Sequence, residues 1–241
     1  MAIHEFDCKG YGQIEPSQVW FTRAGMSESQ CELDPAKFAA HFPARTDEIG
    51  AGKIYAENGA FLMIDKERKI ATIPNKDMSD LGFKMGINYS TEVIYNQFTP
   101  GRRNFCMIAG EYLPRIGFVE PGMRICTNAV AWDDADFDTD LTSRLPAGKT
   151  AATITSEEFY EMVKARIAAM RDETTGRAAG TLTGANAPLY AVVKEGSKGK
   201  LVIGADTDNA IGNVYAIVTE AYYNADNTLS FKLLFVDKPA S

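Results

Sequence analysis

Residues 228–236 read Thr-Leu-Ser-Phe-Lys-Leu-Leu-Phe-Val, and this stretch indicates the class of the fold. Its apolar residues Leu229, Phe231, Leu233 and Phe235 recur at every second position. Successive side chains of a strand point to opposite faces, so this period predicts a strand with one face buried. Residues 213–223 form a second such run, and the Asn- and Asp-containing residues 224–227 between the two predict a hairpin loop.

Short runs with a similar β-like composition continue towards the N-terminus, separated by Gly, Pro, Asn and Asp. They are residues 19–23, 53–56, 60–65, 69–73, 85–95, 104–109, 115–120, 123–131, 190–194 and 200–204. Many short strands with turn residues between them are typical of an all-β domain. We therefore expect a mainly β protein with a β-barrel or sandwich-like body.

One helix interrupts this pattern. Thr155-Ser156-Glu157-Glu158 matches the capping box, in which Thr155 and Glu158 satisfy each other's backbone N–H groups. The apolar residues that follow share one helical face: Phe159, Met162, Val163, Ile167 and Met170. The sequence thus predicts an amphipathic helix at about residues 156–172, inside a helical insertion at about residues 133–187.

The first 50 residues have few periodic apolar positions. Asp34-Pro35 places a capping acid before a first-turn proline and predicts a short helix that ends near Phe42. We expect residues 1–50 to form an extended N-terminal arm, and residues 51–241 to form the β-rich body. The arm would be ordered by contact with a neighbouring molecule through its apolar residues, which are Val19, Trp20, Phe21, Phe38 and Phe42.

Composition excludes several classes of protein. The 241 residues carry 25 Lys and Arg against 32 Asp and Glu, a net charge of −7 that argues against direct binding of nucleic acid. No apolar run approaches the length of a membrane span, and the first ten residues lack the apolar core of a secretion signal. The four cysteines show no C-x-x-C pair, so we expect reduced thiols and no structural zinc.

Catalytic motifs are incomplete. The only two histidines, His4 and His41, have no recognisable nucleophile motif beside them. Gly148-Lys149-Thr150 resembles the end of a phosphate-binding loop, but Ser143 stands where that loop needs its first glycine. We expect no catalytic residue, no cofactor and no metal site.

Three charged segments remain. Asp134, Asp136, Asp138 and Asp140 have the spacing of the first calcium ligands of an EF-hand, but Thr139 and Leu145 replace its Gly and its bidentate Glu. We interpret the acidic run from Asp133 to Asp140 as a solvated loop, with incidental calcium binding as the alternative. The Gly-broken basic loop at residues 194–200 is typical of a solubilising hairpin end, or of a contact with an acidic partner. The pair Arg102-Arg103 is a candidate for a protein interface.

Several segments together resemble a known class of protein. They are Asn58–Asp65, Ile87–Glu92 with Ile94–Phe98, Pro100–Phe105, Pro114–Gly117, and Glu120–Met123 leading to Cys126–Val130. In this order they are similar to small virion structural proteins of tailed bacteriophages, described as head decoration or auxiliary proteins. The resemblance covers about residues 55–131, and more loosely residues 189–236.

The resemblance implies a β-rich, non-catalytic protein that binds the lattice of the major capsid protein and neighbouring copies of itself. It implies a place in the virion, assembled in the host bacterial cytoplasm, as a homo-oligomer or bound to the lattice. Two other functions stay open: a tail or baseplate protein with a carbohydrate-binding β domain, and a metal- or carboxylate-dependent hydrolase. A groove lined by Trp or Tyr would favour the first, and convergence of Asp133, Asp136 and Asp140 in a concave site would favour the second.

Overall fold

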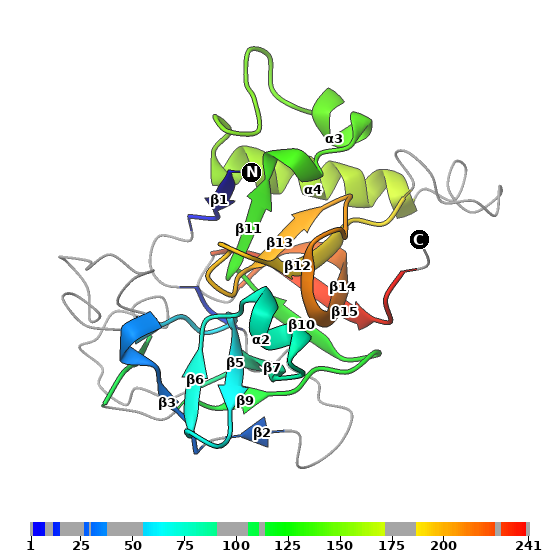
Figure 1. The fold of residues 1–241 in the computed structure, drawn as a ribbon. Helices are drawn as coiled ribbons and strands as arrows, with labels where there is room; N and C mark the ends of the chain where they lie inside the picture. Colours follow the sequence, from blue (N-terminus) through cyan, green and yellow to red (C-terminus); the bar gives the residue numbers. More distant parts are fainter. Residues whose placement is uncertain are drawn as a thin grey trace.

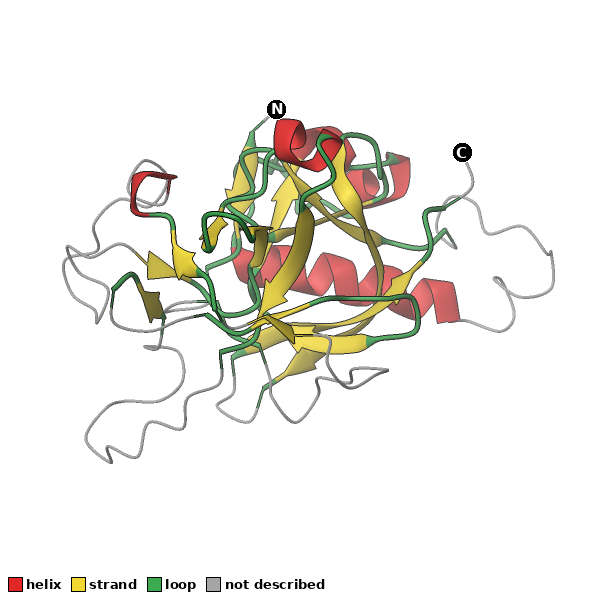
Figure 2. Ribbon diagram, turned by 60° about the horizontal axis from the view of Figure 1, so that its bottom comes forward, coloured by secondary structure: helices red, strands yellow, loops and turns green. Residues whose placement is uncertain are grey.

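The protein is described by a computed structural model (Figure 1). It places residues 2–7, 12–14, 27–28, 30–37, 55–90, 106–110, 114–171, 187–224 and 228–239. These residues form two large sheets and one two-stranded sheet, with a few helices at the periphery (Figure 2). The expected mainly β class is confirmed, and one sheet curls like half of a barrel.

The larger sheet has seven strands and contains both chain ends. Their order across the sheet is β1 (Ile3–Glu5), β11 (Val130–Asp133), β13 (Leu201–Gly204), β12 (Tyr190–Lys194), β14 (Ala210–Tyr223), β15 (Leu229–Val236) and β10 (Arg124–Thr127). All neighbours are antiparallel except β11 and β13. The predicted C-terminal hairpin is confirmed: β14 pairs with β15, and Phe231, Leu233 and Phe235 are buried on one face.

The second sheet has six strands. Their order is β2 (Ser27–Glu28), β9 (Ile116–Gly117), β7 (Lys84–Asn88), β5 (Phe61–Asp65), β6 (Ile70–Thr72) and β3 (Glu32–Leu33). The predicted hairpin of β5 and β6 is confirmed. The short helix α2 (Lys76–Asp80) links β6 to β7, and β4 (Tyr55–Ala56) pairs separately with β8 (Met107–Ile108).

Strand β5 contributes side chains to both hydrophobic cores. Phe61 and Met63 lie in the main core, which also contains residues of the seven-stranded sheet. Leu62 and Ile64 point to the opposite face and lie in a second, smaller core. Because both faces are covered, the strand is a continuous apolar run rather than an alternating one.

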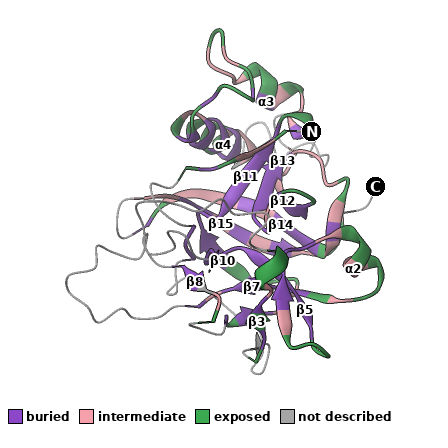
Figure 3. Cartoon of the chain, turned by 60° about the vertical axis from the view of Figure 1, so that its left-hand side comes forward, coloured by how far each residue is buried: buried purple, intermediate pink, exposed green. Residues whose placement is uncertain are grey.

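The predicted amphipathic helix is α4 (Ser156–Arg171). Its capping box is formed: the N–H of Thr155 donates to Glu158 Oε2 at 2.7 Å, and the N–H of Glu158 donates to Thr155 Oγ1 at 3.2 Å. Phe159 and Val163 are fully buried in the main core, and α4 packs against β14. Figure 3 shows that the helix has both buried and exposed residues. Two shorter elements precede it, the 3-10 turn η3 (Asp134–Asp136) and helix α3 (Thr139–Ser143).

The described part of residues 1–50 differs from the expected arm. Strand β1 pairs with β11, β2 pairs with β9, and β3 pairs with β6. Phe6 and Ile14 lie in the main core and Leu33 in the second one. These segments join the body because sheet edges offer unpaired backbone groups that a short extended segment satisfies. Asp34 does cap residues 35–37 as expected, accepting from the Ala36 N–H at 3.0 Å.

No helix among the described residues has the length and apolar character needed to cross a membrane.

Candidate functional site

The residues predicted to form an interface lie outside the part of the chain that the structure describes. They are Val19, Trp20, Phe21, Phe38, Phe42, Arg102 and Arg103. Their role stays a prediction. The candidate site is therefore built from the other charged segments that the sequence singles out.

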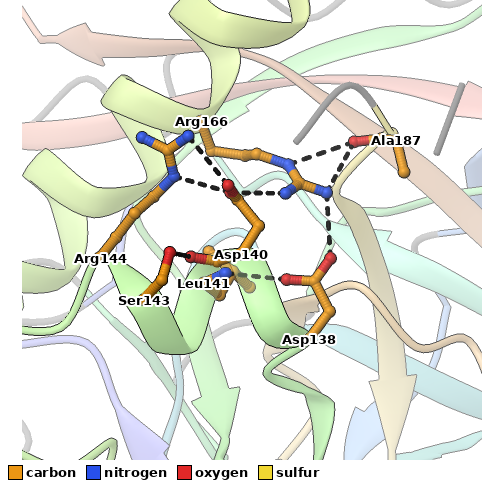
Figure 4. Close-up of polar contacts among 7 residues, drawn as sticks. All are labelled: Asp138, Asp140, Leu141, Ser143, Arg144, Arg166 and Ala187. Carbon is orange, nitrogen blue, oxygen red and sulfur yellow. Dashed lines mark hydrogen bonds and ion pairs between the residues drawn. The ribbon is translucent and has the colours of Figure 1, made fainter. Parts of the chain in front are cut away.

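The acidic run divides between two sets of partners, and its C-terminal half faces α4 (Figure 4). Arg166 of α4 lies 3.0 Å from Asp138 Oδ2 and 2.5 Å from Asp140 Oδ2, and it also donates to the carbonyl of Ala187 at 3.2 Å. Arg144 donates to Asp140 Oδ2 at 2.7 Å. This hydrogen bond lowers the pKa of Asp140 below its ordinary value, and Arg166 adds to the effect against the opposing influence of burial.

Arg166 is the centre of this group. The helical pattern places it off the apolar face of α4, yet its side chain is completely buried. Burial is tolerated because two carboxylates and a carbonyl oxygen surround the guanidinium. The sequence does not indicate that Arg166 is buried, since its partners Asp138 and Ala187 lie 28 and 21 residues away.

The N-terminal half of the run faces the sheet. Asp133 caps η3 by accepting from the Ala135 N–H at 3.1 Å, and Asp134 Oδ1 lies 2.9 Å from His4 Nε2 of β1. Asp136 accepts from Lys194 Nζ at 2.5 Å in a buried pair. Burial raises the pKa of Asp136 above its ordinary value, although Lys194 acts to lower it.

The acidic run is therefore not the solvated loop that the sequence suggests. Asp133 and Asp136 are buried, and Asp136, Asp138 and Asp140 each pair with a basic side chain. Among the residues that the structure describes, no three His, Cys, Asp or Glu side chains are grouped so as to hold a metal ion. Asp136 and Asp140 instead lie in two separate ion pairs, with Lys194 and with Arg166.

The basic loop at residues 194–200 is also used internally. Lys198 and Lys200 bind the carboxylate of Glu5 in β1 at 2.5 and 2.8 Å, and Lys200 lies 2.9 Å from Glu57 Oε2. Partial burial acts to raise the pKa of Glu5, but the two lysines outweigh it and lower the pKa to about 2. The loop thus holds the first strand against the body.

A groove of about 620 Å³ lies between β1 and the start of α4. Trp132 belongs to its lining but is only 3% exposed. The indole stacks with the rings of His4 and Phe159, at centroid distances of 5.7 and 4.6 Å, and its Nε1 donates to the carbonyl of Ala151 at 2.9 Å. The indole therefore offers no open face for a sugar ring to stack on.

A buried polar network joins the two sheets. Asn88 donates to the Glu57 carbonyl at 3.0 Å and accepts from Ser90 Oγ at 2.7 Å. Thr127 Oγ1 donates to the Gln13 carbonyl at 2.7 Å, and Asn128 Oδ1 accepts from the Gln13 N–H at 2.6 Å. Asn88, Ser90, Thr127 and Asn128 are all among the residues that carry the resemblance stated above, and all four are buried.

Comparison of the chain with protein-family models, with curated proteins and with solved structures found no match.

Proposed function

We propose that the chain is a structural protein of a bacteriophage virion, and that it decorates the capsid by binding the lattice of the major capsid protein. The observation that carries this proposal is that four basic side chains of the described residues form ion pairs within the chain. Arg166, Lys194, Lys198 and Lys200 bind carboxylates of other elements in the same chain. Each of these ion pairs joins elements that are distant in the sequence, and breaking a buried one is destabilising because it leaves a charge uncompensated. A fold held together in this way suits a structural role in a particle.

The segments that carry the resemblance support the same proposal. They come from distant parts of residues 55–131, yet Asn58, Asn88 and Ser90 meet in one hydrogen-bonded group: Asn58 Nδ2 donates to the Ser90 carbonyl at 2.8 Å. A buried polar group needs partners, so these hydrogen bonds favour the arrangement of strands that forms them. The residues that carry the resemblance thus connect distant segments of the fold through buried hydrogen bonds.

The test is a protein inventory of purified phage particles by quantitative mass spectrometry. We expect the chain in the particles, at a copy number in a fixed ratio to the major capsid protein, and in the head fraction after heads and tails are separated. Enrichment in the tail fraction would favour the tail or baseplate alternative. Absence from particles would refute a virion role of any kind.

The same particles test the predicted interface. Arg102→Ala with Arg103→Ala should lower the occupancy on heads, because Arg contributes strongly to interfaces. The matched control is Lys66→Ala with Arg68→Ala in the exposed turn between β5 and β6, which removes the same charge. Equal occupancy of the two double variants would show that the arginine pair is not part of the interface.

A further inference from the structure

Lys194 and Asp136 form an ion pair that is almost wholly inside the protein. Lys194 Nζ lies 2.5 Å from Asp136 Oδ1, and the two side chains are 4% and 1% exposed. Lys194 ends β12, and Asp136 belongs to η3, 58 residues earlier in the chain. Gly204 of β13 lies against η3, where an added Cβ would lie 2.4 Å from the Asp136 Cβ. The Ala205 N–H also donates to the Asp136 carbonyl at 3.0 Å, which holds the turn on the strand.

A second carboxylate accompanies the pair. Asp133 is fully buried, and its Oδ2 atom has no hydrogen-bond partner among the described residues. The other carboxylate oxygen of Asp136, Oδ2, is likewise buried and has no such partner. Asp133 lies close enough that its charge acts on Asp136, as does that of Asp206. Asp136 therefore has an incompletely satisfied carboxylate, and a second one, Asp133, repels it, which makes the ionic form of the pair unfavourable.

We propose that Lys194 and Asp136 condense spontaneously to an isopeptide bond, which links β12 covalently to η3. Within the pair, transfer of one proton converts the two ions into a neutral amine and a neutral acid. Burial favours this form, since neither ion is hydrated. The amine and the acid are then held in contact, which supplies the proximity that a condensation in water lacks.

The step is balanced without any further reactant. Nζ of the neutral amine attacks Cγ of Asp136, so that a C–N bond forms and the bond from Cγ to the hydroxyl oxygen breaks. Nζ gives up its proton to the departing hydroxyl within the pair, and the nearby negative charge of Asp133 favours the protonated form of Asp136 that this step needs. One water molecule leaves, and two buried charges have been replaced by one neutral amide.

The product would tie together the two ends of the segment that contains α3 and α4. A covalent closure of this kind restricts the unfolded chain in the same way as a disulfide bond, and it needs no oxidising environment. This inference stands on the buried cluster alone and does not depend on the proposed virion role.

The first test is the intact mass of the purified full-length chain. We expect a mass below that of the sequence by one water molecule, and a digest that contains one branched peptide joining Asp136 to Lys194. A folded chain with the full sequence mass, whose digest yields the two peptides separately, would overturn the proposal and leave the pair ionic.

Variants then assign the bond. Lys194→Arg keeps the charge but has no amine to form this amide, so the full mass should return. Asp136→Asn should lose one ammonia molecule in place of water, and Asp133→Asn should lower the cross-linked fraction several-fold. Lys232→Arg is the control, because Lys232 pairs with Glu220 at a similar 3.0 Å but at the surface, and the mass loss should persist. Persistence of the loss in Lys194→Arg would also overturn the proposal, and if a variant does not fold, the peptide map of the unmodified sequence decides.

Discussion

The guanidinium of Arg166 in α4 lies 2.5 Å from Asp140 Oδ2 in α3, and no part of the Arg166 side chain reaches solvent. The same guanidinium lies 3.0 Å from Asp138, whose side chain is 27% exposed. This contact ties α3 to α4, and α4 in turn packs on β14 of the seven-stranded sheet. The three charges compensate one another, so removing Arg166 would leave the carboxylates of Asp138 and Asp140 without their shared cation.

We expect Arg166→Met to lower the free energy of unfolding by about 3 kcal/mol, because it keeps most of the side-chain volume but leaves two carboxylates without their shared cation. Urea denaturation followed by circular dichroism measures the change. The control is Lys164→Met on the outer side of the same helix, where Lys164 and Glu161 are 53% and 59% exposed. Exposed pairs contribute less than about 1 kcal/mol, so a similar loss in both variants would contradict the central role of Arg166.

The second prediction concerns pH and the attachment of β1. The pKa of Glu5 is lowered in the folded chain from 4.5 to about 2. The ionised form therefore stabilises the fold above about pH 4.5, and this contribution is lost as the pH falls towards 2. Because the Glu5 side chain is 40% exposed, solvent screening reduces the effect to about 1 kcal/mol.

Glu5→Gln should accordingly destabilise the chain at neutral pH, and the difference from the unmodified protein should vanish near pH 2. Thermal unfolding across this pH range measures both values. Glu220→Gln is the matched control, since Glu220 pairs with Lys232 at the surface and the structure gives it no comparable cluster of cations. A difference between Glu5→Gln and the unmodified chain that does not change with pH would show that the lysines do not stabilise β1 in this way.

Local patterns account for what the sequence predicts correctly. The period of two in β15, the charged turn between β5 and β6, and the capping box of α4 each lie within a few neighbouring residues. Such signals act through the geometry of a single strand or helix, so they remain readable without the rest of the fold.

Long-range pairing accounts for what the sequence does not predict. The parallel contact of β11 with β13 joins Val130 to Leu201, and β1 is an edge strand of only three residues. The partners of Arg166 and Lys194 are likewise distant in sequence, and a charged residue in isolation is normally read as exposed. The acidic run appeared solvated for that reason.

The third prediction concerns the N-terminal segment. The sequence suggests that residues 51–241 fold without residues 1–50. The structure favours the opposite result, because Phe6, Ile14 and Leu33 are each only 2% exposed and lie in the two cores. At about 2–5 kcal/mol for each side chain, the loss of all three is comparable to the whole free energy of unfolding of an ordinary domain.

We therefore expect the chain that lacks residues 1–50 to be insoluble or to melt without cooperativity, as seen by calorimetry. The shorter deletion of residues 1–2, which precedes β1, serves as the control and should melt as the full chain does. A cooperative transition for residues 51–241 near the melting temperature of the full chain would restore the boundary that the sequence suggests.

The last prediction concerns the contact between the two sheets at Gly199. Its carbonyl accepts from the Phe61 N–H at 2.7 Å, and its φ is +81°. An added Cβ would lie 2.2 Å from the Phe61 carbonyl oxygen, a backbone atom that cannot move without displacing β5. Gly199→Ala should therefore lower the free energy of unfolding by about 3 kcal/mol or more, from backbone strain and from steric overlap together.

Gly148→Ala separates the two causes, since Gly148 has a similar φ of +77° but no atom within 4 Å of its added Cβ. Strain alone predicts a loss of about 1–2 kcal/mol for that variant, and equal losses in the two chains, measured by urea denaturation, would mean that the close approach of Gly199 to Phe61 does not hold the sheets together.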